Sequence, residues 1–208
     1  MAEESMIFWI GGIIFALSSL LFIFLENQNS SRKYMFNSHV FVSFITTISY
    51  FIMALGLATV TSEGGNPIYW TRWLFYAGSC SILTLDIATI AKKSNEKKAE
   101  VAIFTTLTMF CGYLASIIST EYRWLFFGLS TAAYIGMLYT LFNKSSEDSP
   151  KMSSIMWFVF VTWSLFPLVW ALAPTGFEII AVDITALLYL ALDIVTKILF
   201  GIYITTRK

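Results

Sequence analysis

Asp193 and Lys197 stand four residues apart in a long apolar segment near the end of the chain. In a helix this spacing puts both side chains on one face, and the Lys197 amine leans back toward Asp193 because Cα–Cβ bonds tilt toward the helix N-terminus. A bare ammonium is unfavourable among apolar side chains, whereas an imine that shares its proton with a carboxylate suits them. The pair therefore predicts an aldehyde cofactor bound covalently to Lys197.

A stripe of aromatic residues in a neighbouring segment is suited to form the wall of a pocket for such a cofactor. Trp163, Phe166, Pro167 and Trp170 recur at spacings of three and four, which is the helical period. Taken alone, an aromatic stripe usually indicates packing. Opposite a buried lysine, the same stripe favours a cofactor pocket.

The composition indicates where these residues lie. The chain has 208 residues, of which 57% are hydrophobic and 12% charged, and that is about half the charge of a soluble domain. This low charge content excludes an ordinary soluble enzyme, a disordered tail and a nucleic-acid-binding protein. Thirteen basic and 13 acidic residues cancel, so the chain also has no net field that attracts polyanions. One histidine, His39, and two cysteines in apolar runs, Cys80 and Cys111, predict neither a metal site nor a disulfide framework.

Seven apolar segments each have the length of about 20 residues that crosses a bilayer core. They cover residues 5–26, 34–60, 67–91, 99–119, 122–142, 152–173 and 178–205. Only short polar breaks separate them, so residues 1–208 are predicted to form a single domain, a bundle of seven transmembrane helices. The predicted fold class is an all-α, multi-pass integral protein of the cell membrane. The acidic start of the chain argues against a secretory signal.

Lys and Arg in short loops determine which end of such a bundle faces the cytoplasm. Ten of the 13 basic residues fall in the first, third and fifth loops or at the C-terminus: Arg32, Lys33, Lys92, Lys93, Lys97, Lys98, Lys144, Lys151, Arg207 and Lys208. On the other side only Arg123 is near a membrane end. The N-terminus is therefore predicted to be extracellular and the C-terminus cytoplasmic.

Four ionisable residues are left inside the predicted spans: Arg72 and Asp86 in the third, and Asp193 and Lys197 in the seventh. Charges inside a membrane cost several kcal/mol unless they are paired or face a cavity, so a functional role is the default interpretation. A structural salt bridge is the alternative.

Several of these segments resemble the microbial rhodopsins, the seven-helix retinal proteins. The matching residues are Asn66-Pro-Ile-Tyr-Trp-Thr-Arg72, Tyr122-Arg123, Ser130-Thr-Ala-Ala133, Trp163-Ser-Leu-Phe-Pro-Leu-Val-Trp170 and Leu192-Asp-Ile-Val-Thr-Lys197. The resemblance covers essentially the whole chain. It implies that Lys197 carries all-trans retinal as a protonated Schiff base, with Asp193 as counterion, Tyr50 as a partner of Asp193, and Arg72 on the extracellular side. It also implies a set of residues that contact retinal: Tyr50, Tyr76, Phe127, Ser130, Thr131, Trp163, Phe166 and Trp170.

The third span departs from the pattern of outward proton pumps. Phe75 stands where those pumps carry a carboxylate, Ser79 and Cys80 follow one turn later, and Tyr76 replaces a tryptophan, while Asp86 fills the position of a cytoplasmic carboxylate. Phe, Ser and the following Cys are similar to the schizorhodopsins and the related Antarctic rhodopsins, which are light-driven inward proton pumps. Schizorhodopsins typically have glutamate at the position of Asp86, so Asp86 departs from that group.

The resemblance thus implies an inward proton pump rather than an enzyme. The proton would leave Lys197 toward Asp86, which is roughly 21 Å along the helix axis from Arg72. His39, eleven residues before Tyr50, is expected at the level of Asp86 and is a candidate relay, with an interfacial histidine bonded to a headgroup or water as the alternative. A sensory rhodopsin that signals through a partner protein and a light-gated channel are the other readings. The expected partners are the lipid bilayer, the transported proton and further copies of this chain, as a trimer.

Overall fold

The structure is a computed structural model, which describes residues 2–28, 33–118, 120–143 and 150–206. In that part of the chain, seven spans are long and apolar enough to cross a membrane. The first six are α1 (Ala2–Gln28), α2 (Lys33–Ala54), α3 (Thr71–Ile90), α4 (Asn95–Ile117), α5 (Tyr122–Phe142) and α6 (Pro150–Leu172). The seventh is continuous and consists of α7 (Val182–Asp193), the π-helical segment η2 (Ile194–Leu199) and α8 (Phe200–Thr206). The predicted seven-helix bundle is confirmed.

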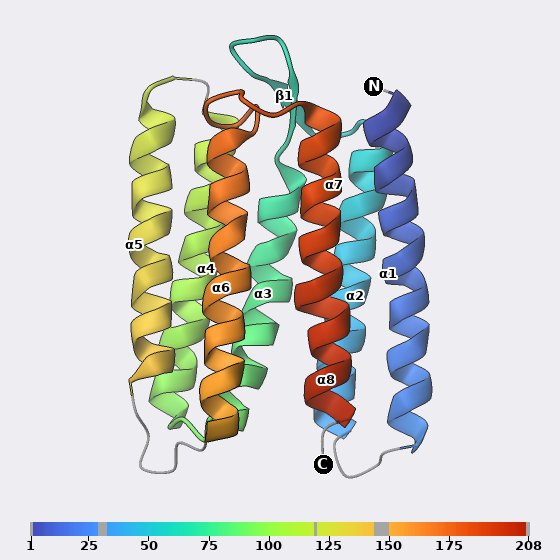
Figure 1. Cartoon of the computed structure of the whole chain (residues 1–208), viewed down its shortest axis with the longest axis vertical. Helices are drawn as coiled ribbons and strands as arrows, with labels where there is room; N and C mark the ends of the chain where they lie inside the picture. The colour runs from blue at the N-terminus through green and yellow to red at the C-terminus, as the bar shows by residue number, and fades with distance from the viewer. Residues whose placement is uncertain (1, 29–32, 119, 144–149, 207–208) are drawn as a thin grey trace.

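The helices run side by side along the long axis of the molecule (Figure 1). Consecutive helices contact each other, and α7 also contacts α1, so the bundle closes on itself. The chain begins at one end of the bundle and finishes at the opposite end, and we refer to these as the N-terminal end and the C-terminal end. Residues of the seventh span can therefore meet α2 and α3 in the interior.

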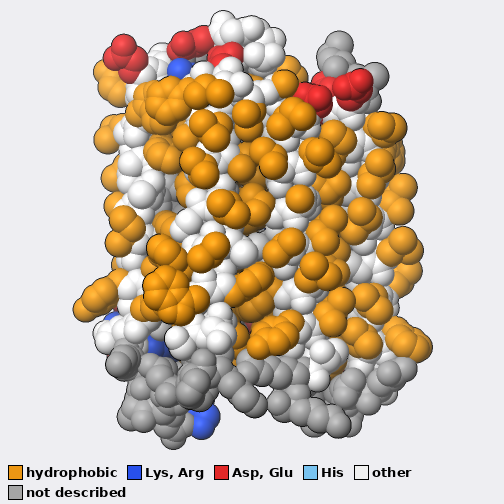
Figure 2. Space-filling model, viewed as in Figure 1, with side chains coloured by type: hydrophobic (Ala, Val, Ile, Leu, Met, Phe, Trp, Pro, Cys, Tyr) orange, Lys and Arg blue, Asp and Glu red, His pale blue; other side chains and the backbone are white. Residues whose placement is uncertain are grey.

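The outer surface between the two ends is apolar (Figure 2). Large exposed hydrophobic side chains occur on many helices, among them Leu17, Leu129 and Leu168. Acidic side chains gather at the N-terminal end in this view. An apolar belt between polar ends is the surface that a lipid bilayer covers, so the chain is a multi-pass integral membrane protein.

Two predicted helix ends are wrong, both beside the loop between the second and third spans. α2 stops at Ala54 rather than at residue 60, because the backbone turns into left-handed conformations at Gly56 and Ala58, with φ of 66° and 55°. Two short antiparallel strands follow, β1 (Thr59–Thr61) and β2 (Pro67–Tyr69), and α3 begins only after them. Apolar residues such as Ile68 continue through this hairpin because it covers the N-terminal end of the bundle, and hydropathy cannot distinguish that burial from a helix.

The seventh helix also begins later than expected, at Val182 rather than at residue 178. Glu178 has a left-handed backbone conformation, with φ of 56°, that a helix cannot contain. This residue instead contacts the β1–β2 hairpin. The loop before α7 is thereby tied to the loop before α3.

Candidate functional site

Asp193 and Lys197 meet in the interior, where α7 passes into η2. Lys197 Nζ donates a hydrogen bond to Asp193 Oδ1, as the spacing of four residues predicts. Asp193 is fully buried and Lys197 is 2% exposed. The backbone around Lys197 is π-helical, and the N–H of Phe200 donates to the carbonyl of Val195 five residues earlier. Such wide turns within α-helices frequently occur at functional sites.

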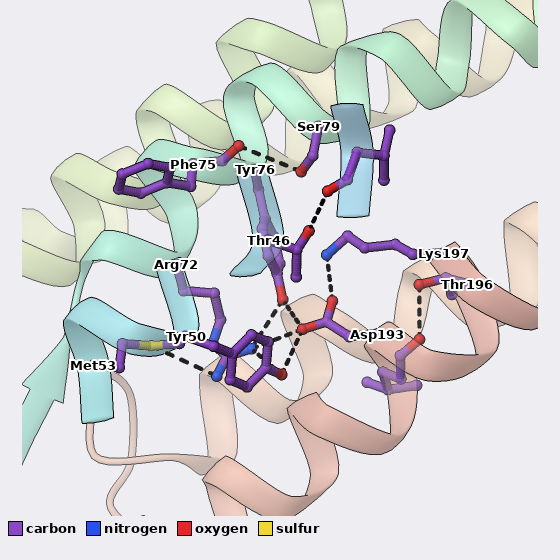
Figure 3. A network of polar contacts seen from close by, with 12 residues as sticks. Thr46, Tyr50, Met53, Arg72, Phe75, Tyr76, Ser79, Asp193, Thr196 and Lys197 are labelled. Atoms are coloured by element: carbon purple, nitrogen blue, oxygen red, sulfur yellow. Dashed lines mark hydrogen bonds and ion pairs between the residues drawn. The ribbon is translucent and has the colours of Figure 1, made fainter. Parts of the chain in front are cut away.

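The second oxygen of Asp193 receives three donors from other helices (Figure 3). The Tyr50 hydroxyl lies 2.7 Å and Arg72 Nη1 lies 3.0 Å from Asp193 Oδ2. The Tyr76 hydroxyl donates to the same oxygen. Together with Lys197, these donors occupy both oxygens of the Asp193 side chain.

The Arg72 guanidinium is enclosed by aromatic side chains. Its Nη1 donates to the hydroxyls of Tyr50 and Tyr76 at 3.2 Å and 2.9 Å, and its Cζ lies 4.5 Å from the ring centroid of Tyr189. A buried ion pair is tolerated only when its remaining donors and acceptors are satisfied, and these contacts do so for Arg72 and Asp193. The sequence analysis missed Tyr189, although it stands one helical turn before Asp193 on the same face.

A cavity lies beside Lys197, which is one of its lining residues. Trp163, Phe166 and Trp170 line it from α6, as the aromatic stripe predicts. The ring of Trp170 stacks on the ring of Phe127 with a centroid distance of 4.6 Å. A lysine that opens into an aromatic, mostly apolar cavity has the chemistry to hold a long conjugated aldehyde. The residues present therefore fit retinal.

The structure brings most of the predicted contact residues to this cavity. Tyr76, Cys80, Ser130 and Thr131 line it together with the aromatic residues named above. Tyr50 is not among the lining residues and instead contacts Asp193 and Arg72.

One side of the cavity was not predicted. It is formed by α4 residues Thr105, Thr108, Met109 and Gly112. Their spacing of three, four and seven is that of one helical face, which is the signal that could have identified them. Further lining residues that the sequence analysis did not single out are Trp73, Leu83, Tyr134, Met137 and Thr196.

Phe75 and Ser79 lie outside this cavity lining. Ser79 is fully buried, and its hydroxyl donates to the carbonyl of Phe75 at 3.3 Å. The ring of Phe75 lies apart from the Asp193 carboxylate in Figure 3. Within the described residues, Asp193 is accordingly the one carboxylate that forms an ion pair with Lys197.

Asp86 and His39 meet toward the C-terminal end of the bundle. Both side chains are fully buried, and His39 Nε2 lies 4.0 Å from Asp86 Oδ2. None of the four side-chain N and O atoms of the pair makes a hydrogen bond in the described part of the structure. Ser38 neighbours Asp86, but its hydroxyl donates to the carbonyl of Tyr34. The alternative of an interfacial histidine is wrong, because His39 has no exposed surface.

Comparison with known proteins supplies the context for this geometry. A family model described as bacteriorhodopsin-like protein matches residues 2–207. Sensory rhodopsin-2 of Natronomonas pharaonis is 23% identical over 204 residues, which cover 94% of this chain and 85% of that protein. A bacteriorhodopsin of Haloterrigena sp. (strain arg-4) is 29% identical over 221 residues, which cover 99% of this chain and 88% of that protein.

Solved structures give a similar result. The crystal structure of schizorhodopsin 4 is 39% identical, with a TM-score of 0.91, and the match covers 99% of this chain and 100% of that one. The thermophilic rhodopsin from Rubrobacter xylanophilus is 26% identical, with a TM-score of 0.88 and coverage of 98% and 95%. The likeness thus extends over nearly the full length of each chain.

Proposed function

This chain belongs to the bacteriorhodopsin-like family, and on that premise we propose that it is a light-driven pump that moves protons into the cell. Proteins of this family are photoreceptors and ion pumps rather than enzymes, and they bind retinal through a lysine. Retinal bound to Lys197 supplies light absorption and a change of shape. The residues of the chain then determine where the proton on Lys197 Nζ goes.

The proposed orientation follows from the basic residues. Among the described residues, Lys33, Lys92, Lys93, Lys97 and Lys98 lie in or beside loops at the C-terminal end, and by the positive-inside rule this supports a cytoplasmic position for that end. The N-terminal end, where Figure 2 shows acidic side chains, then faces the outside. Asp193 and Arg72 are on the extracellular side of the Lys197 nitrogen, and Asp86 is on its cytoplasmic side.

The observation that carries the proposal is the contrast between Asp193 and Asp86. Asp193 receives hydrogen bonds on both oxygens, so both of its acceptor atoms already have partners. Asp86 is buried without a hydrogen bond among the described residues. A buried carboxylate without such a partner is stabilised when it binds a proton. A proton released from Lys197 Nζ is therefore drawn toward Asp86 and the cytoplasm. Phe75 adds no competing acceptor on the extracellular side.

In the proposed cycle, the Lys197 nitrogen regains its proton through the extracellular half of the bundle. A second cavity lies below the β1–β2 hairpin and is lined by Tyr69, Arg72, Thr185 and Tyr189, among others. The Tyr189 hydroxyl is buried and has no hydrogen-bond partner among the described residues. This cavity ends at Arg72, which contacts Asp193, and that position suits proton uptake from outside.

The likeness to schizorhodopsin 4 supports the inward direction, because the resemblance in the third span points to the same group. The curated relatives are less similar and have different functions, since they include sensory rhodopsins and a halorhodopsin at 23–26% identity. Signalling through a partner protein is therefore the reading that an experiment must distinguish from transport.

The test is light-driven pH change in an unbuffered suspension of cells that express the protein with retinal. We expect the external medium to become alkaline on illumination, and a protonophore should abolish the signal. Asp86→Asn should keep the visible absorbance and lose most of the signal, while Asp183→Asn, near the start of α7, serves as the matched control. Acidification would overturn the proposed direction. An absence of any pH change with pigment present would favour a sensor, and a flux that follows the imposed voltage would favour a channel.

A further inference from the structure

His39 and Asp86 form a buried polar pair between α2 and α3. Buried side-chain atoms without a hydrogen bond are rare in folded proteins, and each one costs stability. Here four such atoms, the two ring nitrogens of His39 and the two oxygens of Asp86, lie together. A cluster of this cost indicates a function other than stabilising the fold.

Building on the inward transport proposed above, we propose that His39 and Asp86 hold the transported proton jointly and that Gly201 is the positioning residue that seats His39. The 4.0 Å between His39 Nε2 and Asp86 Oδ2 is too long for a direct hydrogen bond. It is short enough for the charge on one group to act strongly on the other inside a protein. A small movement of either side chain, or one bridging water, then transfers a proton between them.

The proton balance of this step is simple. With Asp86 ionised and His39 neutral, the pair has a charge of −1 in surroundings that disfavour an isolated charge. The proton that leaves Lys197 Nζ neutralises the pair, whether it resides on the carboxylate or on the imidazole. The pair returns to its first state when the proton passes to the cytoplasm, and Lys197 Nζ regains a proton from the extracellular side. No other bond forms or breaks.

The position of the imidazole depends on Gly201 in α8. A methyl group on Gly201 would lie 2.6 Å from His39 Nδ1 and 2.8 Å from Phe22 Cζ, which is closer than real side chains approach. The imidazole ring of His39 also stacks on the ring of Phe22, with a centroid distance of 5.0 Å and an interplanar angle of 28°. Only glycine leaves room for the imidazole between α1 and α8.

Gly201 also places His39 next to the span that carries the cofactor lysine. It is one helical turn beyond Lys197, and the imidazole neighbours the backbone of Lys197 as well. His39 therefore joins the seventh span to Asp86 on α3. A substitution that displaces the imidazole should interrupt this connection while leaving the cofactor cavity intact, because neither His39 nor Gly201 lines it.

The experiment compares His39→Phe and Gly201→Ala with a matched control, Gly128→Ala, whose added methyl group would meet nothing within 4 Å. Phenylalanine can keep the stacking on Phe22 but cannot hold a proton. We expect both variants to keep the visible pigment and to lower the initial rate of light-driven alkalinisation at least about tenfold, since a positioned proton-transfer group contributes roughly 10²–10⁴-fold. Gly128→Ala should pump at the wild-type rate. In the His39→Phe background, Gly201→Ala should have no additional effect.

A spectroscopic measurement tests the pair without relying on transport. Light-minus-dark infrared difference spectra of wild-type protein with isotope-labelled histidine should show an imidazole signal that Gly201→Ala alters and Gly128→Ala leaves in place. If His39→Phe transports protons at the wild-type rate while Asp86→Asn does not transport them, joint proton binding by His39 and Asp86 is wrong. The proposed pump function is then unaffected. If the wild-type protein moves no protons, the proposed pump function is wrong, and the infrared signal then tests the His39–Asp86 proposal by itself. The presence of the imidazole signal supports joint proton binding, and its absence overturns it. If His39→Phe forms no pigment, the infrared signal of the wild-type protein and of Gly201→Ala tests the His39–Asp86 proposal instead.

Discussion

The Tyr76 side chain contacts both members of the central ion pair: its hydroxyl donates to Asp193 Oδ2, and the centre of its ring lies 3.5 Å from Lys197 Nζ. The hydrogen bond from the hydroxyl partly compensates the negative charge of Asp193, while the ring face stabilises the positive charge on the Lys197 nitrogen. One residue therefore sets how strongly the carboxylate and the nitrogen interact.

Tyr76→Phe removes the hydroxyl and keeps the ring. With one donor fewer, the charge on Asp193 acts more strongly on the Lys197 nitrogen and stabilises the positive charge there, so we expect the absorption maximum of the pigment to move to shorter wavelength. Absorption spectra of the purified protein measure this shift. Tyr134→Phe is the control, because Tyr134 also lines the cavity but its hydroxyl contacts Ser164 at 3.1 Å. Equal spectra for Tyr76→Phe and wild type would contradict the expectation.

Lys197→Ala should abolish the visible absorbance of cells supplied with retinal. Among the described residues, Lys197 is the only lysine that lines the cavity, so the substitution removes the amine that binds the aldehyde. The measurement is the absorption spectrum after purification. Lys93→Ala is a suitable comparison, since Lys93 is also mostly buried but donates to the carbonyl of Asn143. A pigment that persists in Lys197→Ala would show that the cofactor is attached elsewhere.

Asp193→Asn should destabilise the protein strongly. The substitution leaves two buried positive groups, Arg72 and the Lys197 nitrogen, without their shared carboxylate, and breaking a buried ion pair in this way costs about 3–5 kcal/mol. The rate of thermal bleaching of the pigment is the readout. Asp183→Asn, in the first turn of α7, should bleach like wild type. Wild-type bleaching in Asp193→Asn would mean that the three charges are not coupled.

Glu178 holds the loop before α7 against the β1–β2 hairpin. Its Oε1 accepts from the N–H of Gly64 and its Oε2 from Asn66 Nδ2, each at 3.1 Å. Partial burial acts to raise the pKa of Glu178, but the hydrogen bonds from Gly64 and Asn66 outweigh it and hold the pKa below its ordinary value. Because the folded-state pKa is depressed, this stabilisation is present above the ordinary pKa of about 4.3. It is lost as the pH falls through the lower folded-state value.

Glu178→Gln should therefore lower the temperature of thermal bleaching by a few degrees near neutral pH, and its difference from wild type should shrink in acid. Bleaching curves between neutral and acid pH provide the measurement. Glu63→Gln is the control, because the ion pair of Glu63 with Arg123 spans 3.7 Å and its carboxylate side chain is 61% exposed, so it contributes little. A Glu178→Gln difference that is the same at every pH would show that shape rather than charge is responsible.

The sequence by itself determined the seven spans and the Asp193–Lys197 pair. Both depend on properties that are local along the chain: the length of an apolar run against the thickness of a bilayer, and the 3.6-residue period that aligns residues four apart. The aromatic wall of the cavity on α6 follows from the same period. The resemblance in the third and seventh spans then identified the cofactor, and the family match agrees with it.

Only the tertiary structure decided which residues from other helices meet these groups. Tyr50 and Asp193 are separated by 143 residues, yet they share a hydrogen bond because α2 and the seventh span contact each other in the closed bundle. The seating of His39 between Phe22, Gly201 and Asp86 likewise draws on α1, α2, α3 and α8. A sequence records which face each residue occupies on its own helix. Which faces then pack together, and which polar atoms are left without partners there, depends on the rotation and depth of every helix in the bundle.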